Sequence, residues 1–234
     1  MGFINNLINN PRFILVAALF ISVLLMNHKA KTLNYQNRER MVSVIMNAGL
    51  FVLLFWKFGP LLTNLSWYLE SPASLLWSSG SLKHVSMGIV AAVIYIVYSN
   101  RKSLVAYFEM GDLLAIGVSV FTFFYYLLVP QPGRITTMPW GMTLEESQIM
   151  YHPLHWYYAI IAFLFLIFLY RAKNIIGSGY YVSRFCLVGG GAILLMSFFE
   201  RTTNFYAGLA TSQYISILLI GCGMYVYDGI AKAK

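Results

Sequence analysis

The sequence predicts an all-α polytopic membrane protein with seven transmembrane helices. Hydrophobic residues make up 59% of its 234 residues and charged residues only 10%, against roughly 25% charged residues in an average soluble domain. Several apolar runs come close to the roughly 20 residues that a helix needs to cross a bilayer. Because these runs are continuous and do not alternate between apolar and polar residues, helices are favoured over a transmembrane barrel.

The apolar runs predict seven spans. They cover residues 12–28, 41–62, 84–100, 110–129, 153–171, 180–199 and 210–228. The first run, Phe13–Met26, leads into the basic sequence His28-Lys29-Ala30-Lys31 and not into a small-residue cleavage site. This is typical of an anchor helix and not of a secretory signal. No segment between the spans is long enough to fold by itself, so a single membrane domain over residues 1–234 is expected.

Local residues mark where several spans begin. His84 follows Lys83 at the start of the third span. Pro153 is expected to open the fifth span, because proline is favoured in the first turn of a helix. Asp112 is expected at the N-cap or first turn of the fourth span, where a negative charge suits the helix dipole. In the sixth span, Gly189-Gly190-Gly191 allows another helix or a lipid tail to approach the backbone closely.

The basic residues predict the orientation of the chain. They gather in four segments that alternate spans place on one side, namely Lys29, Lys31, Arg38 and Arg40, then Arg101 and Lys102, then Arg171 and Lys173, and finally Lys232 and Lys234. The other side has only Arg12, Lys83, Arg134 and Arg201, in longer loops. By the positive-inside rule, we expect the N-terminus outside and the C-terminus in the cytoplasm. The net charge of +8 is then explained without a nucleic-acid partner.

Two outer loops are long, Gly59–Lys83 and Pro130–His152. In the first, Leu65–Leu76 predicts a short interfacial helix with its tryptophan and tyrosine rings at headgroup depth. An ordinary aromatic belt is the alternative. The second loop overlaps the stretch Gly133–Tyr158, which combines histidines, glutamates, an arginine and tryptophans between two apolar runs. The predicted orientation places this stretch outside.

The histidines of this stretch do not predict a metal site. His152 and His155 have i,i+3 spacing, which would place both on one face of a helix. However, Pro153 lies between them, so His152 is expected in the loop, and no cysteine or cluster of carboxylates completes a ligand set. We therefore expect no metal and no other cofactor. Binding or proton transfer at the outer surface is the favoured role.

Three outer residues carry side chains that suit phospholipid chemistry. Arg134 and Arg201 could each hold a headgroup phosphate, since guanidinium forms bidentate contacts with phosphate. The alternative is that they snorkel and only anchor a helix end. His84 is a candidate general base, because imidazole titrates near neutral pH. A histidine at the membrane interface without a catalytic role is the alternative.

Several short motifs follow one another along the chain in a recognisable order. They are Gly111-Asp112-Leu113-Leu114-Ala115, Gly133-Arg134-Ile135-Thr136-Thr137-Met138-Pro139-Trp140-Gly141, His152-Pro153 followed by Tyr157, and Phe198-Phe199-Glu200-Arg201 followed by Ser212-Gln213-Tyr214-Ile215-Ser216. Together with His84 at the start of the third span, they resemble the prolipoprotein diacylglyceryl transferase family, a seven-span family of the bacterial plasma membrane. The resemblance covers roughly residues 45–228. The orientation expected from the loop charges is also the family's.

The resemblance implies an enzyme that moves diacylglyceryl from phosphatidylglycerol to the cysteine thiol of an exported prolipoprotein, at the outer leaflet. This chemistry needs a cationic clamp on the leaving phosphate and a base that helps to form the thiolate. Carried over, it makes His84 the candidate base and Tyr157 a second catalytic residue. It also places Arg134, Arg201 and His152 at the headgroup. The implied partners are a phospholipid and an exported lipoprotein or another membrane protein.

The chain also departs from the family's pattern. The arginine–glycine–asparagine signature is missing from residues 123–132, and the arginine expected before the end of the sixth span is missing from residues 192–195. Tyr158 replaces a glutamate, and Val85 replaces a glycine. Loss of a phosphate-binding arginine should cost on the order of several kcal/mol of transition-state stabilisation. A non-catalytic lipid- or partner-binding membrane subunit is therefore the alternative function. A transporter or channel is disfavoured, because charges are nearly absent from the middle of the spans.

Overall fold

The computed structural model describes residues 11–71, 73, 74, 78, 80–101, 105–144, 148–201 and 205–232. Within this described part, seven helices are long and apolar enough to cross a membrane, which confirms the predicted all-α membrane fold. They are α2 (Pro11–Thr32), α3 (Arg38–Thr63), α6 (Leu82–Asn100), α7 (Val105–Leu128), α8 (Leu154–Arg171), α9 (Tyr180–Ser197) and α10 (Thr211–Lys232). The orientation of the chain in a membrane stays a prediction.

The helices extend beyond the predicted spans mainly at their basic ends. The first helix continues to Thr32, the second begins at Arg38 and the last continues to Lys232. Hydropathy marks only the part of a helix that suits lipid, whereas lysine and arginine are good helix formers and prolong it beyond the apolar run. Helix α8 begins at Leu154, and Pro153 is its N-cap and the last residue of β3, so this proline precedes the helix and does not lie in its first turn.

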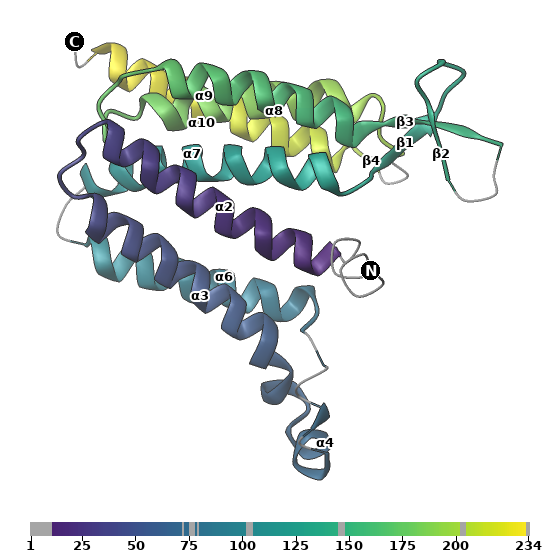
Figure 1. Ribbon diagram of the computed structural model, residues 1–234, viewed down its shortest axis with the longest axis horizontal. Helices are drawn as coiled ribbons and strands as arrows, with labels where there is room; N and C mark the ends of the chain where they lie inside the picture. Colours follow the sequence, from purple (N-terminus) through teal and green to yellow (C-terminus); the bar gives the residue numbers. More distant parts are fainter. Residues whose placement is uncertain are drawn as a thin grey trace, which may run out of the picture. The chain divides into compact units, whose positions relative to one another are not determined.

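Contacts divide the chain into two compact units. Unit 1 consists of Met1–Tyr35 and Gly111–Lys234, and unit 2 consists of Gln36–Met110. The single domain over residues 1–234 stays a prediction. In unit 2, α3 and α6 pack along each other (Figure 1). Gly88 makes this close approach possible, because a Cβ atom there would lie 2.8 Å from the Cα atom of Val52.

The interfacial helix expected at Leu65–Leu76 is shorter in the structure. Helix α4 spans Leu65–Glu70 and follows α3 after a single residue, Asn64. Trp67 and Leu69 on this helix are exposed. The second half of the expected segment falls largely outside the described residues.

In unit 1, one glycine of α9 and one of α10 let these two helices pack closely. A Cβ atom on Gly190 would lie 2.8 Å from Ile220 Cγ1, and one on Gly223 would lie 3.0 Å from the backbone nitrogen of Leu187. Neither position has room for a side chain, so the two backbones approach closely. Gly189 has open space beside it instead.

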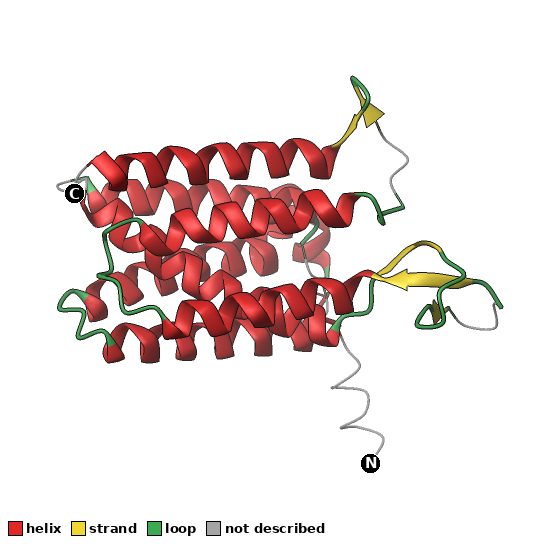
Figure 2. Cartoon of the chain, turned by 90° about the horizontal axis from the view of Figure 1, so that it is seen from above, coloured by secondary structure: helices red, strands yellow, loops and turns green. Residues whose placement is uncertain are grey.

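Unit 1 also contains short strands that the sequence did not predict. Strands β1 (Pro132–Ile135), β2 (Met142–Thr143) and β3 (Met150–Pro153) form an antiparallel sheet in the order β1-β3-β2. Strands β4 (Phe205–Tyr206) and β5 (Leu209–Ala210) form a hairpin. Its two loop residues, Ala207 and Gly208, have φ values of 48° and 81°, as in the primed turns that suit two-residue hairpins. The strands project beyond the helix ends of unit 1 (Figure 2).

Asp112 has a different capping role from the one expected. It lies within α7 and does not cap this helix. Its buried carboxylate accepts hydrogen bonds from the backbone N–H groups of Gly177, Gly179 and Val182, at 2.9, 3.1 and 2.9 Å. Because the first N–H groups of a helix lack partners within the helix, these bonds stabilise the start of α9. A negative charge thus does serve a helix N-terminus, but that of a neighbouring helix.

Candidate functional site

The stretch Gly133–Tyr158 is folded into the three-stranded sheet and the start of α8. In this sheet, Ile135 of β1 and Met142 of β2 both lie opposite Tyr151 of β3. Since β3 leads directly into α8, the sheet holds the loop between α7 and α8 against the start of α8. The glutamates of this stretch, Glu145 and Glu146, lie outside the described residues.

Arg134 is anchored to the end of α9. Its backbone N–H donates to the carbonyl oxygen of Phe199 at 2.7 Å, and its Nε donates to the carbonyl oxygen of Glu200 at 3.0 Å. Gly133 permits this contact, because a Cβ atom there would lie 2.6 Å from the Phe199 oxygen. Within the described part of the chain, the two terminal guanidinium nitrogens of Arg134 have no hydrogen-bond partner. They are exposed donors on a side chain whose base is fixed.

Arg201 lies at the same end of unit 1. Its guanidinium carbon is 4.9 Å from the ring centroid of Tyr151, in a cation–π contact. Tyr151 is buried in β3, between the strands that carry Arg134 and Met142. Arg201 also follows Glu200, whose carbonyl oxygen holds Arg134. The two arginines predicted to bind a headgroup are therefore both anchored where the sheet meets the end of α9.

The Tyr157 hydroxyl contacts two polar side chains, those of Trp140 and His152. Trp140 Nε1 donates to its hydroxyl oxygen at 2.9 Å, and His152 Nδ1 lies 3.1 Å from the same oxygen. The His152 ring also meets Phe199 edge to face, with centroids 5.0 Å apart. Among the residues described, nothing bonds His152 Nε2, and the ring is only partly buried. His152 therefore keeps one nitrogen for a ligand.

Two tyrosines and Glu200 form a second polar group at this end. The Tyr158 hydroxyl donates to Glu200 Oε1 at 3.3 Å, and the Tyr126 and Tyr158 rings stack with centroids 4.5 Å apart. Tyr158 is one of the residues at which the sequence departs from the family's pattern. The structure gives it a carboxylate partner 42 positions away in the sequence, a contact for which the sequence carries no local signal.

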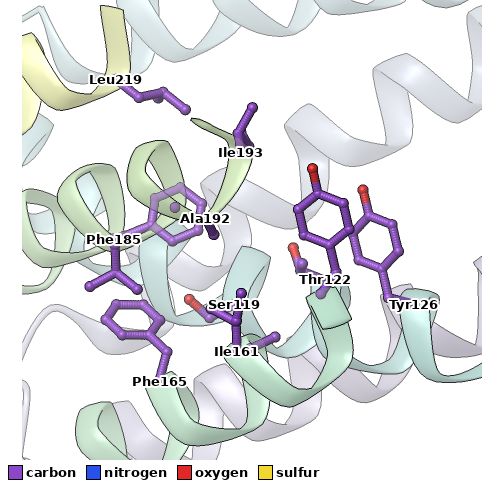
Figure 3. Close-up of a pocket in the computed structure, with 13 residues that line it drawn as sticks. Ser119, Thr122, Tyr126, Ile161, Phe165, Phe185, Ala192, Ile193 and Leu219 are labelled. Atoms are coloured by element: carbon purple, nitrogen blue, oxygen red, sulfur yellow. The ribbon is translucent and has the colours of Figure 1, made fainter. Parts of the chain in front are cut away.

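A cavity of about 180 Å³ opens beside these tyrosines, among α7, α8, α9 and α10 (Figure 3). Its lining is mainly apolar and comprises Ser119, Thr122, Tyr126, Tyr158, Ile161, Ala162, Phe165, Phe185, Val188, Gly189, Ala192, Ile193 and Leu219. Tyr126 and Tyr158 are the lining residues nearest to the strands along their helices. Gly189 keeps the wall of α9 free of a side chain. The cavity therefore extends from an apolar interior to the polar end of unit 1 that carries the strands. We call this end the strand end, and its residues Arg134, His152, Tyr157, Glu200 and Arg201 the strand-end site.

His84 belongs to unit 2. The residue is 7% exposed. Its Nδ1 accepts the backbone N–H of Ser81 at 3.1 Å, and its Nε2 lies 3.2 Å from Thr63 Oγ1. A Cβ atom on Gly59 would lie 2.7 Å from His84 Cβ. The ring thus supports the start of α6 and the packing of α3. Its role as a base stays a prediction.

The remaining histidine of Gly133–Tyr158 has a structural contact. His155 is buried in the first turn of α8, and its Nδ1 accepts the backbone N–H of Gln131 at 3.2 Å. His152 and His155 therefore act separately. Across the described ranges, no three His, Cys, Asp or Glu side chains gather in a group that could hold a metal ion.

The chain is similar to named enzymes from bacteria, although no model of a known protein family matches it. The phosphatidylglycerol–prolipoprotein diacylglyceryl transferase of Wolbachia sp. subsp. Drosophila simulans (strain wRi) is 27% identical over 190 residues, which cover 71% of this chain and 69% of that enzyme. The enzyme of the same name from Wolbachia pipientis subsp. Culex pipiens (strain wPip) is 28% identical over 180 residues, or 69% of this chain and 67% of that one.

A third enzyme of that name, from Wolbachia sp. subsp. Brugia malayi (strain TRS), is 27% identical over 188 residues. The match covers 71% of this chain and 69% of that enzyme. These matches agree with the resemblance of the motifs and with the seven apolar helices. The chain is a transferase-like, multi-pass bacterial membrane protein that is distantly related to the phosphatidylglycerol–prolipoprotein diacylglyceryl transferases.

Proposed function

We propose that this protein binds a phospholipid at the strand end of unit 1 and transfers its diacylglyceryl group to an exported lipoprotein at the outer leaflet of the bacterial plasma membrane. The observation that carries the proposal is the position of the cavity. An apolar space among α7–α10 ends at Tyr126 and Tyr158, and Tyr158 contacts Glu200, to which Arg134 is also bonded. The apolar space and the cationic side chains beside it complement the apolar chains and the anionic phosphate of a phospholipid.

In this proposal an acyl chain enters the cavity and the phosphate lies at the arginines. Arg134 offers its terminal nitrogens and Arg201 a guanidinium that Tyr151 holds. If the Tyr157 hydroxyl donates to His152 Nδ1, a neutral His152 carries its proton on Nε2 and donates it to a phosphate oxygen. Hydrogen bonds to charged groups contribute roughly 1.5–3 kcal/mol each, so these three side chains would orient the headgroup.

The reaction would be a displacement at the glycerol carbon that carries the phosphate. The acceptor cysteine loses its thiol proton to a base, its thiolate forms a C–S bond, and the C–O bond to the phosphate breaks. Glycerol phosphate leaves with the bonding electrons. Cationic groups at the leaving phosphate stabilise the negative charge that develops there. Arg134 and Arg201 are the residues proposed for this role, and phosphatidylglycerol is the proposed donor.

One observation favours a second candidate, a lipid-binding subunit without transferase activity. His84 Nδ1 accepts a backbone N–H, so a neutral ring has its proton on Nε2, which can donate it to Thr63. In this arrangement neither ring nitrogen offers a free lone pair to a thiol. His84 would act as a base only after one of these contacts opens. The second candidate keeps the phospholipid site and drops the chemical step.

Expression in bacterial cells depleted of their own diacylglyceryl transferase tests the proposal. The native chain should restore lipidation of a reporter lipoprotein, measured by the mass of its N-terminal cysteine. The double variant Arg134→Gln/Arg201→Gln should reduce lipidation at least about tenfold, because two charged phosphate contacts are lost. Arg171→Gln is the matched control, since this exposed arginine ends α8 at the opposite end of the helix.

The outcomes separate the two candidates. If the native chain fails to restore lipidation but still binds phosphatidylglycerol through Arg134 and Arg201 in native mass spectrometry, the protein is the non-catalytic subunit. Loss of both lipidation and arginine-dependent binding would refute both candidates.

A further inference from the structure

A second pocket in unit 1 lies at the opposite end of the helices from the strands. It has a volume of about 480 Å³ and is lined by His28, Lys29, residues 32–34, Tyr170 and Lys173. We name it the inner cation pocket. It is formed by the last turn of α2 and the last residues of α8 with the loop that follows. The loop charges predict that this end faces the cytoplasm, so the pocket is separate from the site proposed above.

Lys29 is the buried charge of this pocket. The residue is only 4% exposed, and its Nζ donates to the carbonyl oxygens of Tyr170 and Ala172 at 2.9 and 2.8 Å. An ammonium has three protons, so one donor remains on the nitrogen. No carboxylate in the described part of the chain pairs with Lys29. The ammonium also lies 5.6 Å from the centroid of the Tyr170 ring. Its contacts are therefore two carbonyls and an aromatic face, none of which carries a full negative charge, and an anion in the pocket would provide one.

A second lysine and an imidazole line the same pocket. Lys173 is exposed, and its charge interacts with that of Lys29. His28 contributes an exposed imidazole. Two ammonium groups that share one pocket repel each other, so each favours an anion between them. Leu33 and Tyr170 complete the lining with apolar surface, which suits the organic part of an ester better than a bare inorganic ion.

The wall of the pocket is held in place from several sides. The Tyr170 hydroxyl donates to the carbonyl oxygen of Leu25 at 2.9 Å. The Tyr181 hydroxyl shares its one proton between the carbonyl oxygens of Ala172 and Asn174, at 3.1 and 3.2 Å. Asp112 fixes the following turn through its three backbone N–H contacts. Lys29 and its neighbours therefore need little reordering when they bind a ligand, which reduces the entropic cost of binding.

We propose that the inner cation pocket binds a phosphate ester, either the headgroup of an anionic phospholipid in the leaflet at this end or a soluble phosphate ester. A phosphate oxygen would accept the third Lys29 proton and a hydrogen bond from Lys173. The inference goes beyond the proposed function and does not depend on it, because none of the residues that line this pocket belongs to the strand-end site.

Thermal unfolding of the full chain in neutral detergent tests this proposal. The background is Arg134→Gln/Arg201→Gln, in which the strand-end arginines no longer bind phosphate. The probes are dioctanoyl-phosphatidylglycerol, dioctanoyl-phosphatidylcholine, glycerol phosphate and inorganic phosphate. We expect saturable stabilisation by phosphatidylglycerol, by glycerol phosphate or by both. Lys173→Gln should weaken it about tenfold, since one charged hydrogen bond is lost.

Lys31→Gln is the matched control, because this exposed lysine lies on the same turn of α2 but does not line the pocket. Lys29 is left intact, since its loss would also break the contacts at the end of α8. Stabilisation by phosphatidylglycerol alone identifies a lipid headgroup, and stabilisation by glycerol phosphate identifies a soluble ester. The proposal is overturned if no phosphate ester stabilises the chain saturably, or if Lys31→Gln weakens the effect as much as Lys173→Gln.

Discussion

Two histidines that the sequence places at the outer membrane boundary have opposite surroundings. His84 is buried at the start of α6 and has a protein partner at both ring nitrogens. His152 is partly exposed at the end of β3, and only its Nδ1 has a partner among the described residues. The first ring holds a helix start in position. The second retains a nitrogen for a ligand.

The difference shows that residue type and position at a span boundary do not identify a functional histidine. The two rings differ in how many of their nitrogens already have a hydrogen-bond partner among the described residues. The same distinction applies to Lys29 and Arg134. Lys29 is buried and uses two of its three protons on backbone carbonyls, whereas Arg134 is exposed and uses only Nε and its backbone N–H. Four substitutions test this comparison.

The largest effect on stability is expected for His84→Ala. The substitution removes a buried ring and leaves the Ser81 N–H and Thr63 hydroxyl without their partner. We expect a loss of about 2–4 kcal/mol in the free energy of unfolding, measured by thermal or denaturant unfolding in detergent micelles. If stability is unchanged while lipidation in the depleted cells is abolished, the ring serves chemistry and not the helix start.

A smaller loss is expected for Gly59→Ala. Its new Cβ atom would lie 2.7 Å from His84 Cβ, so the ring or α3 must shift. We expect a cost of about 1–3 kcal/mol in the same unfolding measurement. Gly49→Ala is the control on the same helix, because open space surrounds that position, and alanine should be neutral or stabilising by up to about 1 kcal/mol. Equal effects at the two positions would contradict tight packing around His84.

Tyr157→Phe should have a modest effect on stability. It removes the hydroxyl that joins Trp140 and His152, at a cost of about 1 kcal/mol. Tyr225→Phe is the control, since this tyrosine is 83% exposed and has no hydrogen bond within the described chain. Phospholipid binding should weaken for Tyr157→Phe only, because His152 is then free to rotate. Unchanged binding would show that Tyr157 does not orient His152.

The smallest change in stability is expected for His152→Gln. A partly exposed ring with one hydrogen bond should contribute within about 0.5 kcal/mol. Its effect should appear instead in the affinity for phosphatidylglycerol, which we expect to fall a few-fold in native mass spectrometry. If His152→Gln destabilises the chain as strongly as His84→Ala, the two histidines play the same structural part and the comparison fails.

The helices could be predicted because a bilayer demands long apolar runs. The fifth span was expected at residues 153–171 and is observed at Leu154–Arg171. The strands could not be predicted in this way. Strands β2 and β5 have two residues each, too few to show an alternating pattern. The positions of the strands depend on distant contacts. In β1, for example, the Arg134 N–H donates to the Phe199 carbonyl oxygen.

The candidate site could be predicted only in part for a similar reason. The residue types of Arg134 and Arg201 predicted phosphate binding, because side-chain chemistry is visible in a sequence, and the resemblance to the family added His152. Their partners were not visible. The contact between Tyr158 and Glu200 joins α8 to the turn after α9, and Lys29, which counted only as a loop charge, proved to be buried. Burial of a basic residue after an apolar run depends on the neighbouring helix and not on the local pattern.

The central claim, a phospholipid with its acyl chain among α7–α10 and its phosphate at the arginines, can be tested directly by photocrosslinking. A phosphatidylglycerol with a diazirine near the middle of one acyl chain would be crosslinked to the full chain, and the labelled residues mapped by mass spectrometry. We predict labels on Ile161 and Ile193, which line the cavity, and their loss in Arg134→Gln/Arg201→Gln. Labels confined to exposed positions such as Phe163 and Leu164, unchanged in the double variant, would contradict the claim.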